Sequence, residues 1–338
     1  EGNAVDRAAP YALRAAQHAA SLAAWKEAIT FYEQALSVIR DPRKQLEIYL
    51  ALGNAQMNGG SVTMSSESFR SALALAQHLN AAAQESAARP LLEQSLLLQG
   101  RYAEVIALAQ LTDSVESEMY WGIALSLEGA DLIGADEHLQ KAETLLASAD
   151  PAPRSTLAQI RFERGNVAAQ QGDLTRAVEI YKNALATAEE SSEAWAQQIL
   201  ALNNIAYHLH LLNDASASDY AERGLKLARE RGALFQQTYL LSTLGEIALA
   251  QNDLDRAQNF FDEGLLMATQ LSIPERIAGL TANLGLVAAK RGETSVAIHR
   301  LSTALAQADS LHTHHLAAQI RIWLAPLLPR DEAKMRLN

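Results

Sequence analysis

The sequence predicts an all-α protein built as a solenoid of stacked helix pairs. Three observations support this prediction. Ala177, Ala217, Ala257 and Ala297 recur at intervals of 40 residues. Between the turns, apolar residues recur at three- and four-residue steps, which is typical of helices with one buried face, and strand signals are absent from the sequence. One such helix pair cannot bury its own apolar face, so successive pairs are expected to stack on a continuous core.

The N-terminal half, residues 1–150, is predicted to contain the less regular pairs. Trp25 to Leu36 indicates the second helix of a pair. Further pairs are indicated by Gly53 to Ala72, by a turn and short helix at Gly100 to Val105, and by Gly122 to Ala142. Their turns depart from the pattern of the later repeats, so the spacing of small and apolar residues identifies them.

Residues 154–310 are predicted to form the regular repeats. Gly165, Gly245 and Gly285 lie in register in three first helices, and Ala206 takes this place in the repeat between the first two. A small residue at this position lets the two helices of a pair approach closely, whereas a leucine would push them apart.

The turn inside each regular repeat also has a recurring composition. Glycine or asparagine is followed by an acidic residue, as in Gly172-Asp173 and Asn252-Asp253. Glycine and asparagine adopt the left-handed conformation that ends a helix, and the acidic side chain then caps the next one. In the repeat that contains Ala206, the turn and the second helix are expected to be slightly out of step.

The terminal segment, residues 313–338, is predicted to be a partial ninth repeat. Ile320 to Leu328 indicates a first helix, and Asp331 to Ala333 would begin a second helix that the chain end cuts off. An incomplete pair exposes an apolar end, so self-association through this repeat is one expectation. We interpret residues 1–338 as a single solenoid. Because the chain begins with Glu1 rather than methionine, we interpret it further as part of a longer protein.

Charge and composition exclude several classes of function. The 338 residues include 28 basic and 39 acidic side chains, a net charge of −11, which disfavours direct binding to nucleic acid. There is no cysteine and no apolar run long enough to span a membrane. The sequence has no phosphate-binding loop and no nucleophile elbow. We therefore expect no enzyme activity, no cofactor and no membrane association.

The repeat pattern resembles the tetratricopeptide repeat. That family places a small residue in the first helix, and an alanine, an aromatic residue and a second small residue in the second helix. Three repeats match this order, with leucine in the aromatic place of the third: Gly165, Ala177, Tyr181, Ala184; Gly245, Ala257, Phe261, Gly264; and Gly285, Ala297, Leu301, Ala304. The resemblance implies a right-handed superhelix of about eight helix pairs plus the partial ninth, with the first helices along its concave side.

The long repeats further resemble the C-terminal sensor arrays of bacterial signal-transduction ATPases with numerous domains and of LuxR-type transcription regulators. This resemblance implies a non-catalytic, cytoplasmic sensor or interaction module. Its partner would be a protein, a peptide or a small-molecule inducer. Two alternatives stay open at this stage, a free-standing adaptor scaffold and a peptide-pheromone receptor.

The first-helix positions that peptide-binding arrays of this family use give the candidate binding residues. Phe162 stands where the chaperone-type carboxylate clamp needs a lysine, so binding of a chaperone tail is not expected. The mixture of aromatic and amide side chains suits a peptide backbone or a small polar ligand. The predicted residues are Gln159, Phe162, Asn166, Asn203, Tyr207, His210, Tyr239, Ser242 and Glu246.

Other conspicuous side chains are given structural interpretations. His312, His314 and His315 form a cluster without a carboxylate or a thiol, so no metal site is expected there. His208 is expected at the surface, whereas His210 is a candidate for the groove. The four tryptophans, Trp25, Trp121, Trp195 and Trp323, are expected to pack between repeats.

Overall fold

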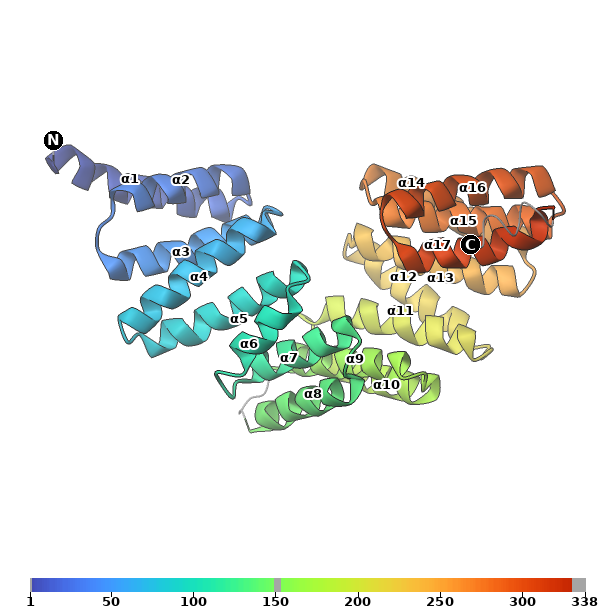
Figure 1. Ribbon diagram of the computed structural model, residues 1–338, viewed down its shortest axis with the longest axis horizontal. Coiled ribbons are helices and arrows are strands. Elements are labelled where there is room, and N and C mark those ends of the chain that lie inside the picture. The colour runs from blue at the N-terminus through green and yellow to red at the C-terminus, as the bar shows by residue number, and fades with distance from the viewer. Residues whose placement is uncertain (1, 149–152, 330–338) are drawn as a thin grey trace. The chain divides into compact units, whose positions relative to one another are not determined.

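The computed structural model describes residues 2–148 and 153–329, and these contain seventeen α-helices, one short 3-10 helix and no strand (Figure 1). The chain divides into an N-terminal unit (Glu1–Ala152) and a C-terminal unit (Pro153–Asn338). Each unit is described by itself. No helix of the described ranges has the length and apolar character that a membrane crossing requires. The prediction that residues 1–338 form one continuous solenoid stays a prediction.

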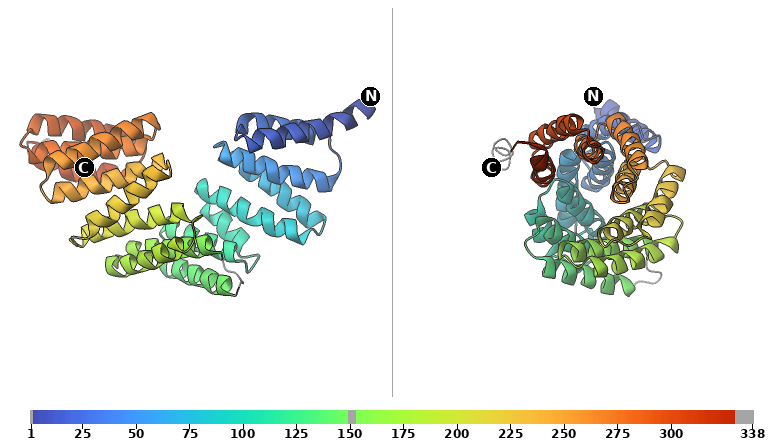
Figure 2. Two further views of the ribbon diagram at one scale, coloured as in Figure 1. Left: turned by 180° about the vertical axis from the view of Figure 1, so that it is seen from behind. Right: turned by 90° about the vertical axis from the view of Figure 1, so that its right-hand side faces the viewer.

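In both units each helix packs against the next one along the chain, as Figure 2 also shows. The N-terminal unit contains α1 (Gly2–Ser21), α2 (Trp25–Val38), α3 (Pro42–Asn58), α4 (Val62–His78), α5 (Ala82–Leu98), α6 (Tyr102–Ala109), α7 (Val115–Glu128) and α8 (Leu132–Ala147). The C-terminal unit contains α9 (Arg154–Gln170), α10 (Leu174–Glu189), α11 (Trp195–Leu211), α12 (Ala217–Glu230), α13 (Leu234–Ala250), α14 (Leu254–Gln270), α15 (Pro274–Lys290), α16 (Thr294–Ser310), α17 (His314–Leu324) and the 3-10 helix η1 (Ala325–Leu327). The all-α helical-repeat solenoid is confirmed, with eight helix pairs and a further first helix.

The glycines of the first helices are required by close packing within each pair. A Cβ atom on Gly165 would lie 2.5 Å from the ring of Tyr181, and one on Gly53 would lie 2.5 Å from the ring of Phe69. At Gly285 the same atom would lie 2.9 Å from Leu301 Cγ. Any side chain at these positions would separate the helices, so the predicted register of small and large residues is confirmed.

The turns follow the predicted chemistry in most repeats. Gly172 and Asn252 have positive φ angles of 84° and 62°. Asp173 and Asp253 then cap α10 and α14 by accepting hydrogen bonds from the backbone N–H groups of Arg176 and Arg256. Glu293, which is one methylene longer than aspartate, makes no such cap at α16.

Three left-handed turn positions carry residues that the sequence pattern did not anticipate. Ala23, Ser272 and His312 have φ angles of 54°, 54° and 56°. Stacking of the flanking helices holds these residues in a conformation that costs a non-glycine residue about 1 kcal/mol or more. The repeat geometry therefore determines the turn even where the local residue does not favour it.

The terminal helix differs from its predicted bounds. It begins at His314 rather than Ile320, and it ends at Leu324, where the chain continues into η1. Pro326 lies inside η1 and cannot donate the hydrogen bond that an α-helix would need, which explains the early end. The second helix predicted from Asp331 lies outside the described residues.

Candidate functional site

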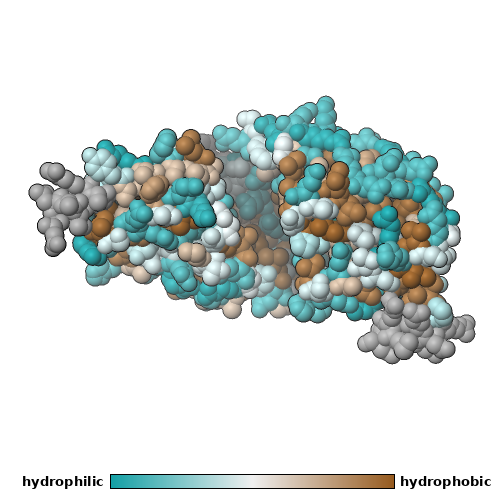
Figure 3. Space-filling model, turned by 90° about the horizontal axis from the view of Figure 1, so that it is seen from above, coloured by the Kyte–Doolittle hydropathy of each residue, from teal (hydrophilic) through white to brown (hydrophobic). Residues whose placement is uncertain are grey.

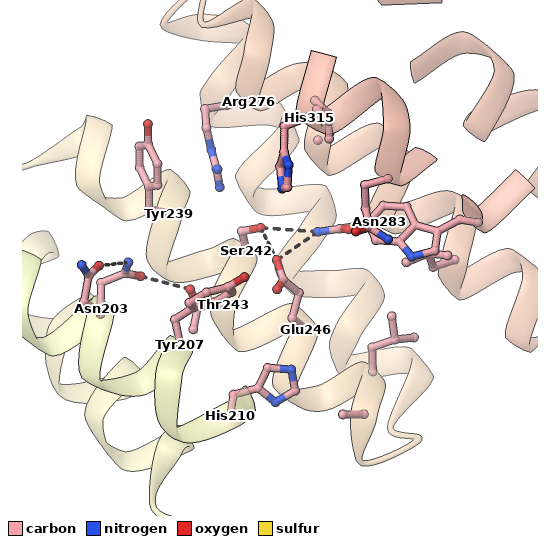
Figure 4. A pocket seen from close by; sticks show the side chains of 18 of the residues that line it. Asn203, Tyr207, His210, Tyr239, Ser242, Thr243, Glu246, Arg276, Asn283 and His315 are labelled. Carbon is pink, nitrogen blue, oxygen red and sulfur yellow. Dashed lines mark hydrogen bonds between the residues drawn. The ribbon is translucent and has the colours of Figure 1, made fainter. Parts of the chain in front are cut away.

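A pocket of about 700 Å³ lies in the C-terminal unit, lined by the first helices of four successive repeats. These helices, α11, α13, α15 and α17, also contact one another in this order. Figure 4 shows the polar side chains that point toward one another across it. Its volume falls in the range of small-molecule sites, about 300–1,000 Å³. The lining includes Asn203, Asn204, Tyr207, His210, Tyr239, Ser242, Thr243, Glu246, Arg276, Gly279, Asn283, Lys290, His315, Gln319 and Trp323.

The repeat period explains why these four helices present side chains to one pocket. Asn203, Thr243, Asn283 and Trp323 are separated by 40 residues each and all line it. Residues one period apart occupy the same position on successive first helices, so their side chains face the same side of the stack. Four of the lining side chains are therefore placed by the repeat itself.

Six of the nine sequence-predicted residues line this pocket, and all six come from α11 and α13. The remaining three, Gln159, Phe162 and Asn166, lie on α9 and do not line it. Phe162 packs against the core, with its ring centroid 5.5 Å from that of Tyr181. The assignment of the nine residues to ligand binding stays a proposal.

A chain of hydrogen bonds runs from α9 to α13 and includes Asn203, Asn204 and Thr243 of the pocket lining. Asn166 Oδ1 accepts hydrogen bonds from the Tyr181 hydroxyl at 2.7 Å and from Asn204 Nδ2 at 3.1 Å, and Asn166 Nδ2 donates to Glu163 at 2.8 Å. Further along, Thr243 donates to Asn203 Oδ1 at 3.0 Å. Burial raises the pKa of Glu163 and of Tyr181, so this network consists of polar groups that depend on one another for partners.

Asn166→Ala is expected to lower the free energy of unfolding of the C-terminal unit by about 2 kcal/mol, because it leaves buried groups of Tyr181, Asn204 and Glu163 without their partner. Urea unfolding followed by circular dichroism measures this change. Gln159→Ala, on the same helix, is the control and is expected to change stability by less than about 0.5 kcal/mol. Equal stabilities of the two variants would contradict the structural role of Asn166.

A second cluster lies inside the pocket and centres on Glu246. Its Oε1 accepts hydrogen bonds from the Ser242 hydroxyl at 3.0 Å and from Asn283 Nδ2 at 3.3 Å (Figure 4). Burial raises the pKa of Glu246, while these hydrogen bonds and the charges of Arg276 and His210 act in the opposite direction. The cluster presents acceptors and a hydroxyl to the pocket, and so can receive donor groups of a ligand.

Arg276 forms another wall of the pocket. Its guanidinium carbon lies 4.0 Å from the centroid of the Tyr239 ring, and Nη2 lies 3.4 Å from the carbonyl oxygen of Thr238. Burial lowers the pKa of Arg276, but a guanidinium stays charged in proteins. The sequence interpretation missed the place of this half-buried cation in the pocket lining, as it missed that of Asn283, His315 and Trp323.

The structure corrects the prediction for His208 and adds a second contact for Trp323. His208 is buried rather than at the surface: its Nδ1–H donates to the Asn204 carbonyl oxygen at 2.7 Å, and the centroid of its ring lies 5.3 Å from that of Tyr181. Trp323 lines the pocket in addition to packing against the core of the last repeat. No group of three metal-ligating side chains occurs within residues 2–148 and 153–329.

Apolar side chains also reach the surface near the pocket. Tyr207 is 39% exposed and Phe235 is 49% exposed, and the Phe235 ring lies 5.3 Å from that of Tyr239. Figure 3 shows apolar side chains gathered in patches among hydrophilic ones over the C-terminal unit, in the right half of the view. Aromatic residues that flank polar groups in this way provide contact area as well as orientation for a ligand.

Neither a protein-family model nor a curated protein sequence matches this chain. Among solved structures, the chain is similar to a signal-transduction ATPase with numerous domains that has a tetratricopeptide-repeat sensor, from Pyrococcus horikoshii. The TM-score is 0.65 at 14% identity, over 91% of this chain and 47% of that one. The chain thus spans about half the length of that protein.

Two further solved structures cover most of this chain. The apo form of RapI matches with a TM-score of 0.60 and 13% identity, over 78% of this chain and 98% of that chain. A tetratricopeptide-repeat protein from Parabacteroides merdae matches with a TM-score of 0.56 and 12% identity, over 83% of this chain and 99% of that chain. The similarity establishes the fold: the chain has the helical-repeat solenoid of tetratricopeptide-repeat proteins.

Proposed function

We propose that the chain is a non-catalytic binding module whose C-terminal unit captures a peptide or small polar ligand in the pocket between α11, α13, α15 and α17. The observation that supports this most directly is the convergence of four first helices on one pocket of about 700 Å³. Aromatic, amide and charged side chains occur together in its lining, which is the composition of sites that both bind and orient a ligand.

The context that we propose for this module is the sensor region of a bacterial signalling ATPase or transcription regulator. The similarity to a protein whose description includes a tetratricopeptide-repeat sensor supports this proposal, since 91% of the present chain aligns with it. A phosphate-binding loop encoded in frame upstream of Glu1 would agree with it. A start codon close to Glu1 would instead favour a free-standing adaptor.

Gly279 gives a direct test of the pocket. A Cβ atom at this α15 position would have no heavy atom within 4 Å, and the residue lines the pocket. Gly279→Phe is therefore expected to keep the fold and to fill part of the pocket. A ligand present at about 100 times its dissociation constant should stabilise the wild-type protein by about 2.7 kcal/mol and the variant by much less.

The measurement is a thermal-shift screen of short peptides and polar metabolites against both proteins. Circular dichroism of the unliganded variant checks that its helices are intact. Ligands that stabilise the wild type and Gly279→Phe equally would place the binding site elsewhere. The absence of any stabilising compound in the screen would count against the proposed function.

A further inference from the structure

The Arg276 guanidinium is a half-buried cation with incomplete hydrogen bonding. Its Nε atom is buried and has no hydrogen-bond partner among the described residues. The hydrogen bond that it does make, from Nη2 to the Thr238 carbonyl oxygen, is long at 3.4 Å. No carboxylate of the described residues lies within ion-pairing distance, although Glu246 is close enough to interact with it electrostatically.

This arrangement is unfavourable in the absence of a ligand. A guanidinium has five N–H donors and cannot lose its charge at ordinary pH. Buried donors without acceptors carry a full desolvation penalty, and the penalty is larger for charged groups. An anionic group that enters the pocket would place an opposite charge beside the guanidinium, which carries no ion pair among the described residues.

The surroundings of Arg276 favour one kind of anion. Tyr239 covers a face of the guanidinium at 4.0 Å. Because Nε is closed to solvent, a ligand in the pocket meets the outer edge of the guanidinium, which the two Nη groups form. Two parallel donors on a planar edge match the two oxygens of a carboxylate. A dianionic phosphate is less suitable because Glu246, in the same pocket, would repel it.

We propose that the pocket binds its ligand through a carboxylate group placed against the outer Nη edge of the Arg276 guanidinium, while Ser242, Glu246 and Asn283 receive polar groups of the same ligand. This inference depends on the proposed function, because it names the ligand class of that pocket. The carboxylate is either the C-terminus of a short peptide or part of a small organic acid. Both sources share the chemistry that Arg276 recognises.

Three sets of probes test the inference by isothermal titration calorimetry. They are N-acetylated tripeptides with a free C-terminal carboxylate, the same tripeptides as C-terminal amides, and the small acids benzoate and succinate. We expect the wild-type protein to bind free acids about 10- to 100-fold more tightly than amides, the range expected for hydrogen bonds to a charged group. Preference for tripeptide acids identifies a peptide ligand, and preference for the small acids identifies an organic acid.

Substitutions at Arg276 complete the test. Arg276→Gln is expected to abolish the preference for free acids, and Arg276→Lys to retain part of it because lysine keeps the charge without the planar edge. Arg291→Gln is the matched control, since Arg291 is a cation at the end of the same helix, paired with Asp255 and outside the pocket. It is expected to bind all probes as the wild type does, and melting curves check that each variant is folded.

The outcomes separate this inference from the proposed function. Equal binding of acids and amides, or undiminished binding by folded Arg276→Gln, would overturn the carboxylate assignment. If Gly279→Phe still prevents the binding of these probes, the pocket remains a binding site, but for another class of ligand. If Gly279→Phe does not affect them, both proposals fail. No binding of any free acid to the wild type would also reject the carboxylate assignment.

Discussion

Gly245→Leu is expected to destabilise the C-terminal unit by about 3 kcal/mol, at the upper end of the range for overpacked cores. A Cβ atom at Gly245 would lie 2.6 Å from Cδ1 and 2.7 Å from Cζ of Phe261, and closer still to Cε1. Phe261 is fully buried and cannot rotate away without displacing its neighbours. Leucine adds three further carbon atoms at this contact, so α13 and α14 would have to separate.

The measurement is urea unfolding of the variant and the wild type, followed by circular dichroism. Gly279→Leu is the matched control, because it places the same side chain in the middle of a neighbouring first helix where the Cβ meets open space. That variant is expected to be as stable as the wild type or slightly more stable, since glycine inside a helix is unfavourable by about 1 kcal/mol. Equal melting temperatures for the two variants would show that the Gly245 contact is not tight.

Glu93→Gln is expected to stabilise the N-terminal unit at alkaline pH by on the order of 3 kcal/mol. Glu93 lies on α5 with no exposed surface, and both its carboxylate oxygens lie within 3.0 Å of the Ser117 hydroxyl on α7. Burial raises the pKa of Glu93 from 4.5 to about 7, against the smaller effects of the Ser117 hydrogen bond and the Arg89 charge. One pKa unit corresponds to about 1.4 kcal/mol, which gives the expected magnitude.

The direction of the pH dependence follows from proton binding. Below pH 4.5 both the folded and the unfolded state hold the Glu93 proton. Between pH 4.5 and about 7 the unfolded state releases it first, so the contribution of Glu93 to stability decreases as the pH rises, and this loss is complete above pH 7. Glutamine keeps the shape and cannot ionise, so the variant lacks this decrease.

Denaturant unfolding of both proteins at pH 4.5 and pH 8 measures the effect. The stability difference between Glu93→Gln and the wild type is expected to be small at pH 4.5 and large at pH 8. Glu67→Gln is the control, because Glu67 is an exposed carboxylate on α4 of the same unit. The same pH response in Glu93→Gln and the wild type would contradict the assignment to Glu93.

The fold could be predicted in detail because packing within each repeat is visible in the sequence. Gly165 and Tyr181 are a glycine and an aromatic residue at a fixed spacing, and the structure places them in contact. The same spacing of a small and a large residue in other helix pairs predicts which positions of the two helices face each other, without reference to helix propensity. Ala23, by contrast, adopts a left-handed conformation that no residue preference indicates, since stacking of helices along the chain imposes it.

The candidate site could be predicted only in part. The position pattern identified Asn203 and Tyr239 but was applied no further than α13, so α15 and α17 were missed. The signal was available, because Asn283 and Trp323 continue the 40-residue register of Asn203. Arg276 does not follow that register. Its proposed part in ligand binding depends on the packing of its guanidinium against the Tyr239 ring and on the lack of a hydrogen-bond acceptor at Nε. Both are properties of the three-dimensional arrangement.

The way in which four repeats line one pocket has a consequence for cooperativity. In a stack where each helix pair contacts only its neighbours, the pairs can open nearly independently of distant ones. The lining extends from Asn203 on α11 to Trp323 on α17, across three repeat interfaces. A ligand that contacts both ends adds a coupling between pairs that are not adjacent. Occupied and unoccupied forms would then differ chiefly in whether the repeats open one by one or as a single block.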